Sequence, residues 1–243
     1  MISSRNRTTT KQTDNDRAVS DMIAFMLVFA TIIGSVALLS TFGIQAMTDY
    51  QEGEQLQNAE RAMISLSDNF DDVLRHDGIE QRYGELSLRE GTITTGNSGT
   101  DVTIEDKNGV SLHDTNLGTF AYQSGSDTIA YEGGGVFRSD GEGSVVLKRP
   151  SLACREDNGV AIISLIKVAS EKRSIQSSGG LGVTMTETDR NRTVYDNIDT
   201  VTVTANTDSS YEGAWNDVYN SDDKWTCEAD RAVVTIVTVD IEY

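Results

Sequence analysis

The sequence predicts an α+β protein, with a long N-terminal helix followed by a β-rich domain built as a sandwich or a rolled antiparallel sheet. Three observations lead to this class. No side chain from Met22 to Thr48 ionises near neutral pH, and residues 50–75 repeat apolar side chains at helical spacing. From about Glu85 onward, apolar residues alternate with a period of two, which is typical of strands.

The composition excludes some partners. The chain has 243 residues, with 38 acidic and 20 basic side chains and a net charge of −18. Such a surface repels nucleic acid and anionic lipid head groups, so any membrane attachment must use an apolar segment. High charge is compatible with disorder or with a folded, carboxylate-rich surface. The strand patterns favour the folded alternative, and the excess of Asp over Glu and of Arg over Lys resembles proteins of salt-loving archaea.

The apolar run from Met22 to Thr48 is predicted to span a membrane. Its 27 residues exceed the ~20 needed for a helix to cross a bilayer. A secretory signal peptide has a shorter apolar region that ends at a cleavage site. A buried helix of a soluble protein is the alternative, but such a helix is seldom apolar around its whole circumference.

Flanking charge predicts the orientation of this span. Basic residues dominate the N-terminal side, and acidic residues follow the span before the next basic residue, Arg61. The basic residues are Arg5, Arg7, Lys11 and Arg17, and the acidic ones are Asp49, Glu52 and Glu54. The positive-inside rule therefore predicts a single-pass protein of the cell membrane, with a cytoplasmic N-terminus and an extracellular C-terminal domain.

Beyond the membrane the helix is expected to continue as an amphipathic segment, residues 50–75. Its apolar stripe is formed by Leu56, Ala59, Met63, Leu66, Phe70 and Val73. His76-Asp77-Gly78 is expected to end the helix, with the glycine in a left-handed cap. Ala30 and Gly34 form a small-xxx-small pair of the kind that favours helix association. Three regions follow: a basic leader (1–18), a long helix (19–77) and a β-rich domain (78–243).

The β-rich domain is predicted from about ten strand patterns separated by short turns. Hairpins are expected around residues 107–110, 124–127 and 139–143. Further strands are expected at 160–168, 183–188 and 200–204, a glycine-rich turn at 177–182, and a short helix at 211–219. Residues 232–243 are expected to form a terminal strand inside a sheet, with Val233, Val237, Val239, Ile241 and Tyr243 on one face and Asp240 and Glu242 on the other.

Asp16-Arg17-Ala18-Val19-Ser20, directly before the apolar run, is similar to the prepilin processing site of archaeal type IV pilins. GGVFRSDGEGSVVLKRP, and AWNDVY followed by a cysteine and a terminal strand, resemble a group of haloarchaeal pilin-like membrane proteins without an assigned activity. The resemblance covers most of the chain. Its motifs are structural and imply a membrane helix packed on a β-rich domain.

This resemblance implies that a prepilin peptidase cuts between Ala18 and Val19, which removes the leader and keeps the membrane helix. It also implies other pilin subunits as partners, beside membrane lipid. Related proteins often have proline where this chain has Asp21, which points to a pilin-like side family. Asp21 has two interpretations: a solvated helix cap at the membrane edge, or an assembly role in which it pairs with the α-amine created at Val19.

No catalytic residue, cofactor, metal or small-molecule substrate is evident. His76 and His113, with the two cysteines, are too widely separated for a zinc site to be expected. The chain has no GxSxG, P-loop or HExxH motif. The acidic clusters Asp68/Asp71/Asp72 and Asp222/Asp223 lack EF-hand spacing, which favours a solvated acidic surface over a cation site.

Two covalent features are expected if the domain is extracellular. Cys154 and Cys227 either form a disulfide or are two unrelated buried thiols. Asn191-Arg192-Thr193 is an outward-facing N-glycosylation sequence, whereas Asn6-Arg7-Thr8 lies on the cytoplasmic side.

These observations lead to one principal functional expectation and two alternatives. We expect a non-enzymatic, pilin-like surface protein with a structural, assembly or adhesion role in type IV pilus-like structures. A membrane-anchored extracellular binding module that does not assemble is the first alternative. An extracellular hydrolase is the least favoured, because no nucleophile–base pattern is visible in the sequence.

Overall fold

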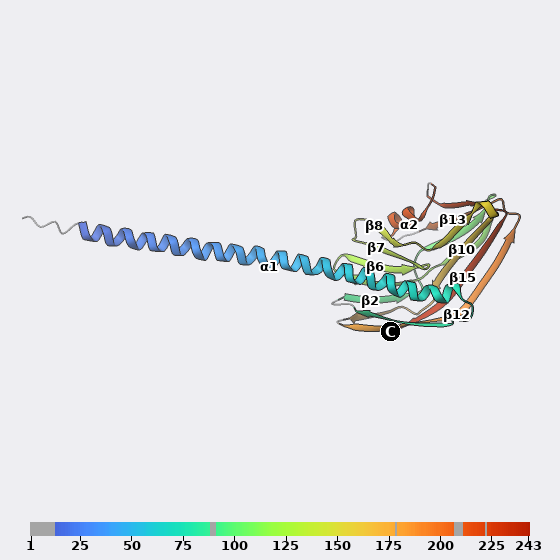
Figure 1. Ribbon diagram of the computed structural model, residues 1–243, viewed down its shortest axis with the longest axis horizontal. Coiled ribbons are helices and arrows are strands. Elements are labelled where there is room, and N and C mark those ends of the chain that lie inside the picture. The colour runs from blue at the N-terminus through green and yellow to red at the C-terminus, as the bar shows by residue number, and fades with distance from the viewer. Residues whose placement is uncertain (1–12, 88–90, 178, 207–210, 222) are drawn as a thin grey trace, which may run out of the picture. The chain divides into compact units, whose positions relative to one another are not determined.

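The predicted α+β class is confirmed by the computed structural model (Figure 1), which describes residues 13–87, 91–177, 179–206, 211–221 and 223–243. A long, apolar N-terminal helix precedes a β-rich domain in which antiparallel pairing dominates. The chain forms two compact units, Met1–Gly53 and Glu54–Tyr243. Their boundary falls inside the first helix, so the amphipathic residues 54–75 belong to the β-rich unit.

Helix α1 runs from Thr13 to Arg75 and therefore differs from the expected range of 19–77 at both ends. The predicted amphipathic stripe is confirmed, because Ala59, Met63 and Phe70 are at most 1 % exposed. The expected left-handed cap is wrong: Gly78 is not among the described glycines with positive φ. Instead, the amide of Ile79 donates to the carbonyl oxygen of His76 at 3.1 Å and closes a turn.

The strands of the β-rich unit form three sheets. The five-stranded sheet has the spatial order β1 (Gln81–Ser87), β12 (Gly180–Asp196), β15 (Arg231–Glu242), β10 (Val160–Val168) and β9 (Ser151–Arg155). The six-stranded sheet has the order β11 (Arg173–Ser177), β2 (Gly91–Gly96), β5 (Thr119–Ser124), β6 (Asp127–Glu132), β7 (Gly135–Ser139) and β8 (Ser144–Lys148). The four-stranded sheet has the order β14 (Trp225–Glu228), β13 (Thr200–Asn206), β3 (Asp101–Asp106) and β4 (Ser111–Asn116).

Two short helices complete this unit: the 3-10 helix η1 (Glu156–Asn158) and α2 (Glu212–Val218). The predicted helix at 211–219 and the three predicted hairpins are confirmed; β3 pairs with β4, β5 with β6, and β7 with β8. Several strands have no counterpart among the expected patterns, notably β2, β9 and β11. These short strands contain few alternating apolar residues, so their pairing depends on neighbouring strands.

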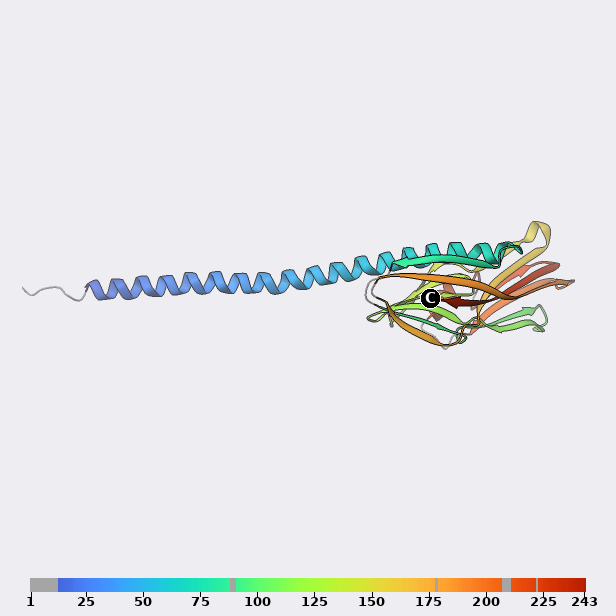
Figure 2. The ribbon, with the colours of Figure 1, turned by 90° about the horizontal axis from the view of Figure 1, so that it is seen from below.

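The buried side chains divide into two cores. The Phe70 core lies where the last turns of α1 cross the strands (Figures 1 and 2), and the Trp215 core is closed by α2 and the four-stranded sheet. The Phe70 core contains Ala59, Met63, Leu66, Phe70, Val73, Leu74, Leu86, Ile93, Phe120, Tyr122, Ile129, Tyr131, Val136, Ile166, Val168, Val183, Met185, Val237, Val239 and Ile241. The Trp215 core includes Val102, Ile104, Ala121, Ala130, Phe137, Ala161, Ile163, Leu165, Val201, Val203, Ala214, Trp215, Val218, Trp225, Cys227, Ala232, Val234 and Ile236.

The terminal strand β15 contributes to both cores, which corrects the one-sided pattern expected for residues 232–243. Val237, Val239 and Ile241 of the predicted face lie in the Phe70 core and Tyr243 packs against it, whereas Val233 is a member of neither core. The even-numbered side chains of the first half, among them Val234 and Ile236, lie in the Trp215 core. β15 pairs in parallel with β10 and antiparallel with β12, so the C-terminal strand is inside a sheet as expected. The β10–β15 pair departs from an all-antiparallel sheet.

The turn expected over the glycine-rich segment 177–182 is shorter than predicted: β11 ends at Ser177, Gly179 is a bend and β12 already begins at Gly180, while residue 178 lies outside the described residues. β12 starts at Gly180, pairs with β1 and continues to Asp196, far beyond the expected end at 188. Gly182 lies close to Tyr83: a Cβ at this position would lie 2.7 Å from the hydroxyl oxygen, at the far end of a side chain that is 64 % exposed. Gly180 and Gly182 therefore belong to a strand and not to the turn.

Candidate functional site

The residues Val19–Ile44 of α1 form a 26-residue segment that is long and apolar enough to cross a membrane. None of its side chains is buried within the protein. Phe25, Phe29 and Leu39, for example, are 69 %, 55 % and 73 % exposed. Exposure of this much contiguous apolar surface to water is very unfavourable, whereas lipid removes the cost. This segment is therefore the principal candidate functional site.

Three hydroxyl groups within the segment, those of Thr31, Ser35 and Thr41, bond to the helix itself. Thr31 Oγ1 donates to the carbonyl oxygens of Leu27 and Val28, both at 2.8 Å. Thr41 Oγ1 donates to the carbonyl of Ala37 at 2.6 Å, and Ser35 Oγ bonds to the preceding turn in the same way. Because an unpaired donor in hydrocarbon costs several kcal/mol, these internal bonds make the polar residues compatible with a lipid environment.

The residues of the predicted processing site lie at the start of this segment. The side chains of Arg17 and Ala18 lie outside the described residues, although their backbone is part of α1. Val19 and Asp21 are exposed. The pair Ala30 and Gly34 is also exposed, and a Cβ at Gly34 would meet nothing within 4 Å. The roles expected for these residues in cleavage, assembly and helix association remain predictions.

Within the β-rich unit, basic side chains of the strands hold the second half of α1, among them Arg82 on β1, which contacts Asp72 at 3.2 Å. Arg138 on β7 contacts Glu60 at 2.8 Å and Asp127 at 3.0 Å. Lys148 on β8 contacts Asp68 at 2.8 Å and Asp71 at 3.1 Å. The acidic cluster Asp68/Asp71/Asp72 is thus partly neutralised by basic residues of other elements, so it is not only a solvated surface.

A further cation, Arg190 on β12, binds the C-terminal end of α1. Its Nη2 donates to the carbonyl oxygen of Val73 at 2.5 Å, and its Nη1 donates to the carbonyl of Leu74 at 3.3 Å. Glu187 and Asp77 pair with the same guanidinium at 2.6 and 3.2 Å. A cation at this end of a helix satisfies free carbonyls and complements the helix dipole.

Arg138, Lys148 and Arg190 were not predicted from the sequence. Each pairs with residues far away in the chain, and no short motif marks such a contact. The sequence shows them only as three of the 16 basic residues in a unit that has 33 acidic ones. The structure thereby explains why α1 ends where it does and how its amphipathic half is fixed.

Cys154 on β9 and Cys227 on β14 form a disulfide, with their Cα atoms 5.5 Å apart. The bond joins an edge strand of the five-stranded sheet to an edge strand of the four-stranded sheet, at the margin of the Trp215 core. Of the two alternatives left open by the sequence, the structure therefore has the disulfide.

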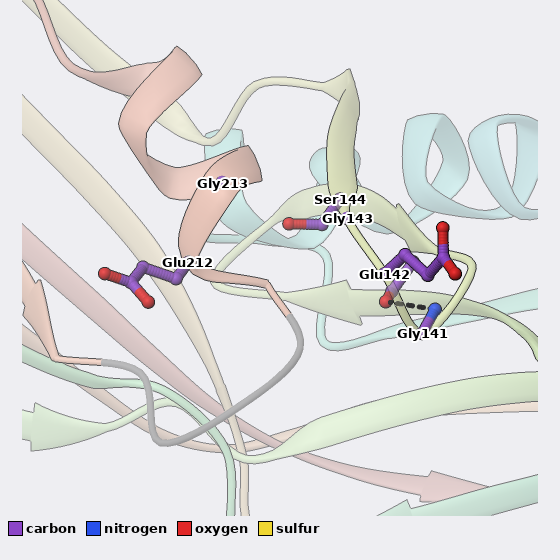
Figure 3. A pocket seen from close by; sticks show the side chains of 7 residues that line it. Gly141, Glu142, Gly143, Ser144, Glu212 and Gly213 are labelled. Atoms are coloured by element: carbon purple, nitrogen blue, oxygen red, sulfur yellow. Dashed lines mark hydrogen bonds between the residues drawn. The ribbon is translucent and has the colours of Figure 1, made fainter.

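A shallow pocket of about 280 Å³ lies between the β7–β8 turn and the start of α2 (Figure 3). It is lined by Ser139, Gly141, Glu142, Gly143, Ser144, Glu212 and Gly213. The two glutamate side chains are separated in Figure 3, and neither points toward the serine hydroxyl of Ser144. This arrangement does not form the nucleophile–base contact that covalent catalysis requires.

The two histidines lie in different parts of the β-rich unit. His76 follows the end of α1, and its Nδ1 contacts the carbonyl oxygen of Asp72 at 3.2 Å. His113 lies on β4, where burial and the positive charge of Lys167 lower its pKa against the opposing effect of Asp114. Among the residues that the structure describes, no three His, Cys, Asp or Glu side chains are grouped as a metal site would need.

Comparison with known proteins gives one family match. The model of a family of unknown function (DUF7289) matches residues 17–242, which includes the apolar segment and the β-rich unit. No curated protein and no solved structure matches the chain.

Proposed function

The chain belongs to the family of unknown function DUF7289, and from this premise we propose that it is a membrane-anchored, pilin-like surface protein. In this proposal it has a structural, assembly or adhesion role in archaeal type IV pilus-like structures. Its apolar helix segment lies in the cell membrane, and its acidic β-rich unit lies outside the cell. No enzymatic activity is part of the proposal.

The observation that carries the proposal is the apolar segment Val19–Ile44. It is one uninterrupted piece of α1, all its side chains are exposed, and the hydroxyl groups of Thr31, Ser35 and Thr41 bond to its own backbone. The same helix ends in an amphipathic part that is built into the Phe70 core of the β-rich unit. A cleavable signal peptide has no need of such a continuation, because it is removed before the domain is complete.

The charge distribution supports the outward orientation. Four basic residues precede the apolar segment, and residues 54–243 contain 33 acidic and 16 basic side chains. Basic residues near a span are retained on the cytoplasmic side. The disulfide between Cys154 and Cys227 supports the same orientation, because the exterior allows such bonds to persist.

The pilin-like part of the proposal is supported by the Asp16–Ser20 sequence next to the apolar segment. Cleavage between Ala18 and Val19 by a prepilin peptidase would leave the whole anchor in the mature protein. The mature chain would then begin at the first residue of the exposed segment. Other pilin subunits are the proposed protein partners of this segment.

Peptide mapping of the N-terminus of membrane-extracted protein tests this proposal. We expect the mature chain to begin at Val19. Substitution Ala18→Leu should block cleavage and leave Met1 or Ile2 at the N-terminus, whereas the control Lys11→Gln should be processed normally. A wild-type N-terminus at Met1 would refute processing, and an N-terminus beyond Ile44 would refute the anchor.

Assembly is tested separately by shearing cells and analysing the released filaments. The protein should be present in the filament fraction of wild-type cells and absent from it when cleavage is blocked. Correct cleavage without any filament association would favour a membrane-anchored binding module in place of an assembling subunit.

A further inference from the structure

The second half of β12, from Thr188 to Asp196, is a free sheet edge. β15 pairs with one side of this half. On the other side, β1 pairs with β12 only as far as Thr186, and no described strand pairs beyond that residue. The side chains of this half are exposed or half-buried, and none is fully buried.

Asn191 lies near the middle of this free edge and is exposed. Thr193 is on the same face of the strand, because side chains two residues apart point to the same side. Its Oγ1 donates to Asn191 Oδ1 at 3.0 Å. The bond uses the amide oxygen, while Nδ2 makes no hydrogen bond to a described residue.

The neighbouring residues hold this part of the strand in place. Tyr195, on the same face, donates its hydroxyl to the carbonyl oxygen of Leu112 at 2.7 Å and packs against the Trp215 core. On the other side, Arg190 is fixed by α1 and Glu187. Asn191 is therefore presented on a rigid strand whose conformation is set by its neighbours.

We propose that Asn191 carries an asparagine-linked oligosaccharide. The Asn-Arg-Thr sequence has the required spacing, and the structure places Asn191 at an exposed position of a strand half that pairs on one side only. The proposal rests on the outward orientation in the proposed function, because glycan transfer takes place on that side of the membrane. Asn6-Arg7-Thr8 lies on the opposite side of the apolar segment and is therefore not modified.

The donor is an oligosaccharide linked to a polyprenyl phosphate or pyrophosphate. A bond forms between Asn191 Nδ2 and the anomeric carbon of the first sugar, and the bond from that carbon to the phosphate oxygen breaks. The lipid phosphate leaves with the bonding electrons, and the amide nitrogen loses one proton. No oxidation or reduction takes place.

Glycopeptide mapping and intact-mass analysis test the proposal in a host whose own surface proteins carry asparagine-linked glycans. Wild-type chain should carry a glycan at Asn191. Asn191→Gln and Thr193→Val should remove it, and Thr193→Ser should retain it because the hydroxyl is preserved. The control Arg192→Gln, between the two required residues, should leave the modification in place.

A second sequon in the same unit separates the two ways in which the proposal could fail. Val110 is 57 % exposed beside the β3–β4 turn, and Val110→Thr completes an Asn-Gly-Thr sequence that starts at Asn108. A glycan at Asn108 but not at Asn191 would overturn the present inference and leave the outward orientation intact. The absence of a glycan from both Asn108 and Asn191 would overturn the inference about Asn191 and the outward orientation of the unit.

Asn6 gives the matching test on the other side of the membrane. The glycosylation of Asn6 is measured in the Ala18→Leu variant, because cleavage after Ala18 would remove Asn6 from the mature chain. An unmodified Asn6 beside a modified Asn191 supports the proposal, whereas a glycan on Asn6 with none on Asn191 would reverse the orientation and refute it.

Discussion

Glu132, at the end of β6, is a carboxylic acid that is only 1 % exposed. Thr100 Oγ1 donates to its Oε2 at 2.7 Å. Burial raises the pKa of Glu132 from 4.5 to about 7, although hydrogen bonds from Thr100 oppose the shift. The nearby Thr119 hydroxyl is buried and makes no hydrogen bond to a described residue. The neutral acid is thus the form that the fold prefers.

We predict that Glu132→Gln removes a pH dependence of stability. The unfolded carboxyl ionises near pH 4.5 and the folded one near pH 7, so the unfolded state binds fewer protons between these values. Stability of the native protein should therefore fall by about 3 kcal/mol as pH rises from 4.5 to 7, and then level off. Urea unfolding of both proteins in detergent, at several pH values, measures the difference.

The exposed Glu142 provides the control, since Glu142→Gln should change this profile little. The difference in unfolding free energy between Glu132→Gln and native protein should change with pH. If it stays constant from pH 4.5 to 7.5, the raised pKa of Glu132 is contradicted. The opposite slope would mean that the folded state prefers the charged carboxylate.

At the scale of elements, α1 combines two segments with different requirements. The stripe at Ala59, Met63, Leu66, Phe70 and Val73 was visible in the sequence because helical spacing is a local property. Its partners were not visible, because the Phe70 core is assembled from strands distributed over the whole domain. Phe70 packs edge-on against Tyr131, with ring centroids 5.7 Å apart, although the two residues are 61 positions apart in sequence.

We predict that Arg190→Gln destabilises the β-rich unit by about 1–3 kcal/mol. The change removes donors from two helix-end carbonyls and leaves Glu187, whose side chain is 15 % exposed, without its cation. Unfolding of full-length protein in detergent can be followed by fluorescence of the buried Trp215 and Trp225.

Arg173 supplies a matched control for this experiment. It lies 3.9 Å from Asp240 and its side chain is 47 % exposed, so Arg173→Gln should cost less than about 1 kcal/mol. Equal effects of the two substitutions would show that Arg190 acts only as a surface charge and does not cap α1.

At the scale of the whole molecule, charge is the dominant property. Residues 54–243 carry 33 acidic and 16 basic side chains, and several of the described cations are already used in contacts such as those of Arg138, Lys148 and Arg190. The remaining carboxylates repel one another across the surface. Salt reduces this repulsion, because the screening length falls from ~10 Å at 0.1 M to ~3 Å at 1 M.

We therefore predict that the thermal midpoint of the β-rich unit rises between 0.1 and ~2 M KCl. A gain of about 2 kcal/mol would correspond to a rise of about 4–8 °C. Replacing the exposed pair Glu156 and Asp157 by Gln and Asn should reduce the salt slope. A midpoint that falls with KCl would refute a net repulsive surface.

The sequence by itself determined the features that depend on neighbours along the chain. These are the α+β class, the apolar segment, the amphipathic stripe and the hairpins that have a turn sequence between alternating strands. Each is recorded in local spacing, because helices and hairpins form contacts a few residues apart. The sequon at Asn191 and the two cysteines were also visible, although the sequence left their state open.

Only the tertiary structure decided which side chains meet across the domain. β15 contributes Val234 and Ile236 to the Trp215 core, and its residues Val237, Val239 and Ile241 to the Phe70 core. The sequence pattern indicated one buried face and could not predict that both faces of the strand are buried. The burial of Glu132, the helix end at Arg190 and the Cys154–Cys227 bond likewise join distant residues. The physical reason is that strand order and sheet packing set these contacts, and neither is encoded in the spacing of adjacent residues.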